Sequence, residues 1–335
     1  TTLRHRRGGV DQPMRRVSRL IGFLVLCLFF LVSLAAARPF LLLVPRTKRM
    51  RLLAGIVRLW ARACLRVLGL KISVSGFSDG LRTDRRLLVC NHQSYLDVII
   101  IASVFPTLFV AKTEVRRWPL FGWLSELGGT IFVNREDARS GVKCAYRVSR
   151  TLRGGVNVQV FPEASTSDGA TVLPFKGLFF ASAIRSRTTA LPLTIKFQSV
   201  NGRPMDREAL DKVCWHGDMD FARHFWKFLN IESAEVSLMI NEPIEPVRAR
   251  RAKALAEVAR ERIFRSFTNA EAIAAARAEV PVEFARAESH SQTDELTGNE
   301  TVTAADYIIS ALLFSHFSSG PSEPIREATS PSENE

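Results

Sequence analysis

An uncharged run of 18 residues near the start of the chain, Leu20 to Ala37, most restricts how this chain can fold. As a helix the run would measure roughly 27 Å, close to the thickness of the hydrocarbon core of a bilayer. We therefore expect an N-terminal segment that is embedded in a membrane.

Basic residues flank the apolar run on both sides, so the positive-inside rule does not select one orientation. Both flanks have the character of cytoplasmic segments. This symmetry favours a helix, a break at Arg38-Pro39 and a second apolar segment, Phe40 to Val44, that together enter one leaflet as a hairpin. A single membrane span is the competing topology. A cleaved signal peptide is a third alternative, because Ser33 to Ala37 resembles a cleavage site.

The five cysteines argue against export, since they are odd in number, scattered and without a C-x-x-C pair. The pattern indicates a reducing compartment and no structural metal. They are Cys27, Cys64, Cys90, Cys144 and Cys214.

Basic residues continue after the apolar run, and the formal net charge is +13 with a pI near 10.1. Lys48 to Leu70 alternates apolar residues with arginines, which suits either an amphipathic helix on an anionic membrane surface or an ordinary packed helix. Because no nucleic-acid motif is present, phospholipid headgroups are the better partner for this charge, and nucleic acid is not expected.

The middle of the chain predicts an α/β fold, with a mixed central sheet flanked by helices. We expect one helix from Val142, Tyr146, Ser149 and Leu152, which repeat at helical spacing before Gly154-Gly155. The expected strands are near Arg86 to Cys90, Thr107 to Ala111, Thr130 to Asn134, Asn157 to Phe161, Ala190 to Phe197 and Glu235 to Ile240.

These features divide the chain into five parts. Residues 1–19 form a basic tail, 20–70 a membrane-associated helical segment, and 71–247 the α/β domain. Residues 248–280, rich in alanine and arginine, are expected to be helical. The acidic, Ser/Thr/Glu-rich residues 281–335 are expected to form a disordered tail.

Within the α/β domain, His92 and Asp97 lie five residues apart where the strand near Arg86 to Cys90 becomes a helix. Ser94 has the chemistry of an N-cap, and Asp97 would then lie at the third helical position, where it can reach back to the turn. From there a carboxylate can also fix the tautomer of His92 and stabilise its imidazolium form, as a general base requires. The alternative is an ordinary capping box beside a histidine with a structural role.

Two more charged residues follow strands. Arg135 ends the strand near Thr130 to Asn134, and Glu163 follows the strand near Asn157 to Phe161. Strand ends of this kind line the ligand crevice of open α/β sheets, and arginine can bind phosphate through two hydrogen bonds. Alone, each would more often be a solvated charge or a cap.

Together these segments resemble the glycerolipid acyltransferase family that includes 1-acyl-sn-glycerol-3-phosphate acyltransferases. The family pattern H-x-x-x-x-D matches His92 and Asp97, and Leu191-Pro192-Leu193 matches a later apolar block with proline. Two further blocks, G-x-x-F-x-x-R and F-P-E-G, match Gly129, Phe132 and Arg135, and then Phe161, Pro162 and Glu163. Ala164 departs from the family's usual glycine, so it would be strained if this position needs a positive φ.

The resemblance implies acyl transfer from a thioester to the hydroxyl of a lysophospholipid, 1-acyl-sn-glycerol-3-phosphate first of all. It implies that His92 is the base and Asp97 its partner, that Arg135 holds the acceptor phosphate, and that Glu163 organises the acceptor or that arginine. Lys176 is a weaker phosphate candidate. No cofactor or metal is expected, and the donor would be acyl-CoA or an acyl-carrier protein, used at the cytoplasmic face. Another lysolipid, such as a lyso-ornithine lipid, and a non-catalytic membrane-anchored lipid-binding protein are the alternatives.

Overall fold

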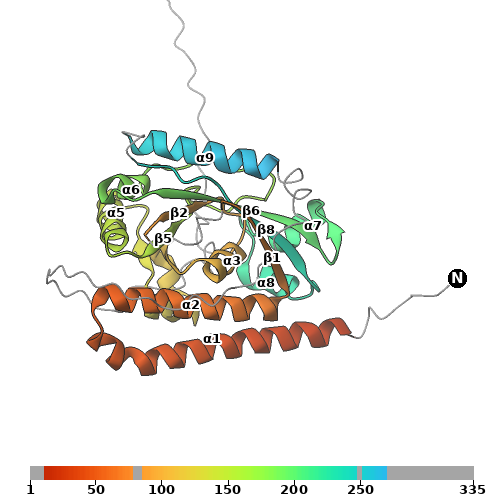
Figure 1. The fold of residues 1–335 in the computed structure, drawn as a ribbon. Helices are drawn as coiled ribbons and strands as arrows, with labels where there is room; N and C mark the ends of the chain where they lie inside the picture. The colour runs from red at the N-terminus through yellow and green to blue at the C-terminus, as the bar shows by residue number, and fades with distance from the viewer. Residues whose placement is uncertain (1–10, 78–84, 247–250, 270–335) are drawn as a thin grey trace, which may run out of the picture.

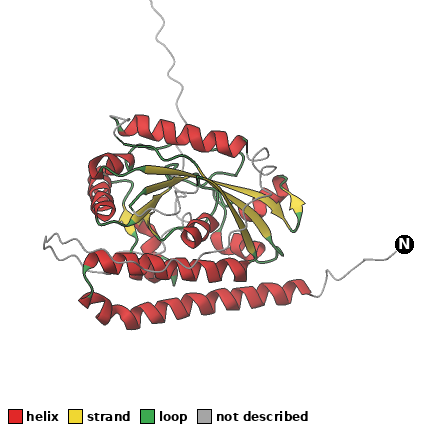
Figure 2. Ribbon diagram, viewed as in Figure 1, coloured by secondary structure: helices red, strands yellow, loops and turns green. Residues whose placement is uncertain are grey.

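The fold is built on one twisted sheet with helices on both faces (Figure 1, Figure 2). The structure is a computed structural model, and it describes residues 11–77, 85–246 and 251–269. Three predicted segments lie wholly or partly outside the described residues. They are the acidic tail expected for 281–335, the helical residues expected beyond 269 and most of the basic N-terminal tail. The prediction of a mixed α/β sheet flanked by helices is confirmed.

The sheet has the strand order β1-β8-β6-β2-β5-β3-β4, with β7 paired to β6. Every pair of neighbouring strands from β6 to β4 in this order is parallel. The pair formed by β8 and β6 is antiparallel. The bounds are β1 Leu70–Gly76, β2 Leu87–Cys90, β3 Thr107–Lys112, β4 Ile131–Val133, β5 Asn157–Val160, β6 Ala190–Val200, β7 Arg203–Pro204 and β8 Ala234–Ile240.

Two hydrophobic cores cover the two faces, because successive residues of a strand point to opposite sides. Leu88 and Cys90 of β2 face the core formed with α1, α2, α3 and α8, while Leu87 and Val89 face the core formed with α5, α6 and α9. The helices are α1 Asp11–Leu43, α2 Arg46–Leu68, α3 Leu96–Val104, the 3-10 helix η2 Thr113–Arg117, α4 Phe121–Leu127, α5 Ala138–Arg153, α6 Phe180–Ser186, α7 Arg207–Val213, α8 Phe221–Phe228 and α9 Ala252–Thr268.

Helix α1 is the one helix of the described residues that is long and apolar enough to cross a membrane. It lies lengthwise along α2 (Figure 1). One stripe of α1, which includes Phe23, Cys27 and Phe30, is buried against the protein. The other side presents large apolar residues to the outside, namely Ile21, Leu24, Val25, Leu28, Phe29, Val32, Phe40, Leu42 and Leu43.

The break expected at Arg38-Pro39 is wrong. Helix α1 continues through Pro39 to Leu43, and the chain turns only at Val44 and Pro45 before α2 begins. A proline inside a helix removes one backbone hydrogen bond, yet burial of Leu41 and a hydrogen bond from the Arg49 guanidinium to its carbonyl hold this last part of α1 in place. The chain therefore turns about six residues later than the sequence predicted, and Phe40 to Leu43 continues α1 instead of forming the second arm of a hairpin.

Helix α2 is an ordinary packed helix, the second alternative for the Lys48 to Leu70 segment, since it lies between α1 and α3. Leu53, Val57 and Trp60 are buried on it. Two of its arginines, Arg58 and Arg62, donate hydrogen bonds to the Ser103 carbonyl at the end of α3. The arginines of α2 thus tie the N-terminal helices to the helix that carries Asp97.

Candidate active site

The turn between β2 and α3 brings His92 and Asp97 into contact. Asp97 lies in the first turn of α3, and its Oδ2 is 2.8 Å from His92 Nδ1. The same oxygen accepts the backbone N–H groups of Gln93 at 2.7 Å and Ser94 at 2.8 Å. Both His92 and Asp97 are buried. Asp97 therefore fixes the imidazole and the backbone of the turn with one oxygen atom, as the sequence predicted for a carboxylate at this spacing.

Ser94 does not cap the helix as expected. Tyr95 is the residue that flanks α3, and the Ser94 side chain is buried without a hydrogen-bond partner among the described residues. Asp97 supplies the contact back to the turn instead. A charged acceptor serves the backbone N–H groups better than a hydroxyl would, because hydrogen bonds to an ionised acceptor are stronger.

The turn is anchored to the sheet by amide side chains. Asn91 accepts the backbone N–H of Ile195 in β6 and donates to the carbonyl of the same residue, both at 2.9 Å. Gln93 Nε2 donates to this carbonyl as well, at 2.8 Å. The imidazole ring is stacked on Phe161, with ring centroids 3.9 Å apart. Sequence reasoning missed this role of Asn91, which directly precedes His92.

Glu163, which follows β5, contacts the same turn from the neighbouring strand. Its Oε1 accepts the backbone N–H of His92 at 3.1 Å, and the residue is 4% exposed. Burial, with a smaller contribution from the Asp97 charge, raises the pKa of the Glu163 carboxyl to about 8, against the opposing effects of hydrogen bonds from backbone N–H groups and of the Arg260 charge. At neutral pH the carboxyl is therefore mostly protonated. It supports the turn, whereas the sequence suggested that it would organise Arg135 or the acceptor.

Arg135 follows β4, and its guanidinium donates a hydrogen bond to the carbonyl oxygen of Ala164. Ala164 has φ 64°, in the left-handed region that glycine adopts without strain. This is the condition under which the alanine at this position was expected to be strained. The loop after β5 therefore keeps the shape that the usual glycine would give it, with a local conformational penalty.

Lys112, at the end of β3, is a candidate site residue that the sequence analysis missed. It is paired with Val133 of β4, two residues before Arg135. Burial, and then the positive charge of Arg135, lower the pKa of the Lys112 ammonium. Because β3, β4, β5 and β2 are parallel, Lys112, Arg135, Glu163 and His92 leave the sheet at the same edge. The signal was present, because Lys112 directly follows the predicted strand Thr107 to Ala111.

The remaining predicted site residues lie in and before β4 and in the loop after β5. Gly129 precedes β4 with φ +105°, which a side chain would strain, and Phe132 is buried under the Arg116 guanidinium. Pro162 is buried, and its carbonyl accepts the backbone N–H of Lys176 at 2.8 Å. Lys176 itself is exposed. Among the predicted residues, His92 thus contacts Asp97 and Glu163, and Arg135 contacts the residue that follows Glu163. Gly129 lies before β4 and Phe132 in its middle, instead of at the strand end that carries Arg135.

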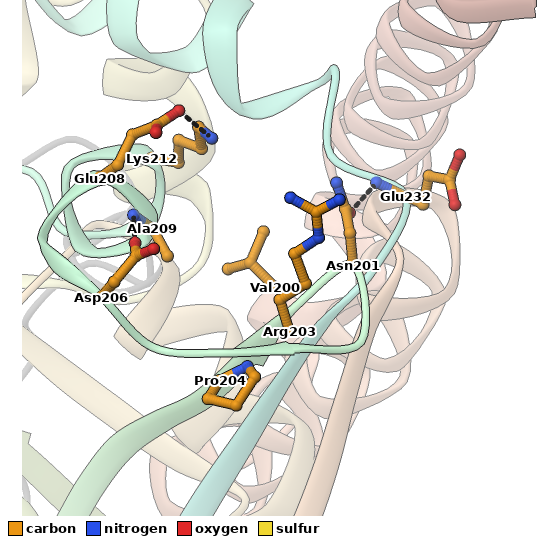
Figure 3. Close-up of a pocket in the computed structure, with 9 residues that line it drawn as sticks. All are labelled: Val200, Asn201, Arg203, Pro204, Asp206, Glu208, Ala209, Lys212 and Glu232. Carbon is orange, nitrogen blue, oxygen red and sulfur yellow. Dashed lines mark hydrogen bonds and ion pairs between the residues drawn. The ribbon is translucent and has the colours of Figure 1, made fainter. Parts of the chain in front are cut away.

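A cavity of about 400 Å³ lies elsewhere, between the β6–β7 turn, α7 and Glu232 (Figure 3). Its lining is polar, and several of the polar groups are paired with one another. Lys212 forms an ion pair with Glu208 at 2.7 Å, and the backbone N–H of Glu232 donates to Asn201. None of the predicted site residues lines this cavity.

Comparison with known proteins agrees with the site. A family model described as Acyltransferase matches residues 71–196. The lyso-ornithine lipid O-acyltransferase of Rhizobium meliloti is 33% identical over 62% of this chain and 72% of its own. That of Pseudomonas aeruginosa is 31% identical over 68% of this chain and 83% of its own. The 1-acyl-sn-glycerol-3-phosphate acyltransferase of Neisseria gonorrhoeae is 31% identical over 45% of this chain and 57% of its own.

A solved structure shows the same fold. The crystal structure of the 1-acyl-sn-glycerophosphate acyltransferase PlsC from Thermotoga maritima covers 76% of this chain and 98% of its own, with a TM-score of 0.51 and 22% identity. The family prediction made from the motifs is confirmed. Because this chain covers more than two thirds of relatives that are more than 30% identical to it, it belongs to the acyltransferase family that includes the 1-acyl-sn-glycerol-3-phosphate acyltransferases, and it is an enzyme of this kind.

Proposed function

We propose that this protein transfers a fatty acyl group from a thioester donor, acyl-CoA or an acyl-carrier protein, to the free hydroxyl of 1-acyl-sn-glycerol-3-phosphate. The observation that carries the chemistry is the contact between His92 Nδ1 and Asp97 Oδ2 at 2.8 Å. A buried carboxylate that accepts the Nδ1–H keeps the other ring nitrogen, Nε2, in its basic form.

In this mechanism Nε2 of His92 takes the proton of the acceptor hydroxyl while the oxygen attacks the thioester carbonyl. The new C–O bond forms, the C–S bond then breaks, and the departing sulfur takes the proton from the imidazolium. Asp97 stabilises the imidazolium in between. A covalent acyl-enzyme is not required, because a thiolate is already a good leaving group.

The cations at the ends of β3 and β4 support a phosphate acceptor. Lys112 is paired with Val133, two residues before Arg135, and the Arg135 charge adds to burial in lowering the pKa of Lys112. A phosphate monoester carries a charge of roughly −1.5 to −2 at neutral pH, so it can neutralise both cations at once. Arginine can hold such a group through two hydrogen bonds, and lysine adds a point charge.

A lyso-ornithine lipid is the second candidate, because two relatives with high coverage carry that name. One observation in the site favours it. Glu114 lies near both cations and raises the pKa of each through its negative charge. An ornithine headgroup carries a carboxylate and an ammonium, so Glu114 could accept the ammonium while Arg135 binds the carboxylate.

Acyl transfer to a panel of lysolipids, with purified protein in nanodiscs and the product resolved by mass, tests the proposal. We expect lysophosphatidate to be the preferred acceptor. Lys112→Ala should raise its KM by about tenfold or more, the range expected when a charged contact to a phosphate is lost. Arg117→Ala, an exposed cation on the neighbouring η2, is the matched control and should change little.

The two acceptors are separated by Glu114→Gln. If lysophosphatidate is the substrate, removing this negative charge should lower its KM or leave it unchanged. A preference for lyso-ornithine lipid that is lost in Glu114→Gln would instead establish the second candidate. Inactivity with every lysolipid would refute both and favour a lipid-binding protein.

We also propose that α1 lies in one leaflet, with α2 between it and the α/β domain, and that the catalytic site faces the cytoplasm. Arg15 and Arg16, near the start of α1, contact Glu232 and Asn230 of the α/β domain, at 2.8 and 2.5 Å. The N-terminal end of α1 therefore lies on the same side of any membrane as the site. Its outward apolar residues then contact lipid along its length.

A further inference from the structure

Helix α5 carries a cluster of positively charged side chains without negatively charged ones among them. Its sixteen residues contain five cations and no acidic residue, and Arg185 and Arg187 lie at the end of the neighbouring α6. Lys143 and Arg150 form no ion pair with any of the described residues. The five cations of α5 are Arg139, Lys143, Arg147, Arg150 and Arg153. They extend over roughly 21 Å of helix.

Apolar groups are exposed within this basic face. Val142 is 64% exposed and Tyr146 is 47% exposed, while Leu178 before α6 is 41% exposed. The Arg185 guanidinium lies over the Tyr146 ring at 5.6 Å from its centroid. A small apolar centre with charged residues around it is the usual anatomy of a surface that binds another protein.

The position of α5 connects this basic face to the acyltransferase site. Helix α5 begins at Ala138, three residues after Arg135, and Asp137 caps its N-terminus. It packs on α6 and on strands β4 and β5, whereas α1 packs on α2 and α4 (Figure 1). The basic face therefore starts beside the strand ends that carry the site and belongs to a different helical layer from the apolar side of α1.

We propose that the exposed face of α5 docks an acidic acyl-carrier protein that presents the acyl thioester to His92. This inference rests on the proposed function, and it selects between the two donor classes. The charge complementarity is direct, because a strongly acidic partner meets a helix that has five cations and, beyond its N-cap Asp137, no acid. Docking near Arg135 would place the partner's flexible phosphopantetheine arm beside the strand ends.

The alternative occupants fit this face less well. The phosphates of CoA form a compact group that a few converging cations can hold, whereas the α5 cations are spread along four turns. An anionic membrane is the other alternative. However, the lipid-facing side of α1 would orient the protein so that the bilayer lies against α1, and α5 packs in a separate layer.

The test is direct binding of a fluorescently labelled holo-acyl-carrier protein to the full-length protein in phosphatidylcholine nanodiscs, at low and high salt. We expect salt-sensitive binding for the wild type. Lys143→Glu combined with Arg150→Glu should weaken it by about tenfold or more, as expected when charges across an interface are reversed. Lys253→Glu is the matched control, because this side chain is exposed in the first turn of α9, where an acid is tolerated.

Activity with two donors completes the test. The double variant should lose kcat/KM with acyl-carrier protein and keep it within about twofold with acyl-CoA, which also shows that it is folded. Absence of carrier binding in the wild type, or equal binding by the double variant, would overturn the inference. So would a variant that loses binding only to phosphatidylglycerol vesicles, since that would assign the face to lipid.

These outcomes separate the docking inference from the proposed function. Transfer from acyl-CoA to a lysolipid without carrier binding would overturn the docking alone. Carrier binding through α5 without transfer to any lysolipid would support the docking and refute the proposed function.

Discussion

The buried carboxyl of Glu163 predicts how the stability of this protein depends on pH. Its pKa is about 8 in the folded protein, against an ordinary value of 4.5. The folded state therefore holds the proton more tightly than the unfolded state does. Below pH 4.5 the residue is protonated in both states and imposes no penalty. Between pH 4.5 and 8 the unfolded state ionises first, so the free energy of unfolding decreases, and above pH 8 it levels off.

The magnitude follows from the two pKa values. Each pKa unit corresponds to about 1.4 kcal/mol, so the folded state is destabilised at high pH by at most about 5 kcal/mol. Most of this lies between pH 5 and pH 9, where the change is about 4 kcal/mol. The 4% exposure of Glu163 means that solvent screens this penalty little. Other groups also titrate in this window, so only a comparison with a variant isolates Glu163.

Glu163→Gln is the informative perturbation, because the amide oxygen can still accept the backbone N–H of His92 while the charge is removed. Denaturant unfolding of both proteins in detergent should show a difference in free energy of unfolding that grows in favour of Glu163→Gln as the pH rises from 5 to 9. Turnover at pH 7 should be retained. The exposed Glu257→Gln on α9 is the control and should show no such trend. A difference that is independent of pH would refute the reasoning.

Four further predictions concern the site and the membrane segment. His92→Ala should lower acyl transfer by roughly 10²- to 10⁴-fold in a steady-state assay with unchanged protein amounts, and near-normal turnover would rule it out as the base. Arg135→Ala should raise the KM for lysophosphatidate more than the KM for the donor, whereas an unchanged acceptor KM would show that Arg135 is structural. Ala164→Gly should raise the free energy of unfolding by about 0.5–1 kcal/mol, because relief of about 1–2 kcal/mol of strain exceeds the entropy that glycine adds to the unfolded chain, and a destabilised variant in a denaturant titration would contradict this. Cysteines placed at Arg16 and Lys48, without the native cysteines, should react with an impermeant maleimide only after the cytoplasmic face is opened, and labelling of the Lys48 position from outside intact cells would contradict the proposed orientation.

Much of the site could be predicted from the sequence because its residues lie at strand ends, and strand ends are local features. His92, Arg135 and Glu163 each lie within three residues after a short apolar strand, and parallel strands bring such residues to one edge of a sheet. The partners of these residues could not be predicted in the same way. The contact between Asn91 and Ile195 joins residues far apart in the sequence, and no local pattern indicates it.

The fold shows the same division. Six of the strands were expected near their observed positions, but β1 was missed because Leu70 to Gly76 directly follows a long helical pattern. The helix expected before Gly154-Gly155 is α5, but the residues that indicated it do not share one buried face. Val142 and Tyr146 are exposed, while Ser149 and Leu152 are buried. Helical spacing fixes which residues share a face, but the packing partners decide which face is buried.

The pairing of β1 with β8 has a consequence for biosynthesis. Leu70 is hydrogen-bonded opposite Ala234, so a strand made early waits for one of the last elements of the domain to leave the ribosome. During this interval α1 and α2 have already been made, and β6 has only the two-residue β7 as an antiparallel neighbour. If α1 enters the bilayer as proposed, it would hold the nascent chain at the lipid surface while β1 and most of the β6 edge await β8. A ribosome that stops before residue 234 should release a product that proteases remove, however complete its catalytic motifs are.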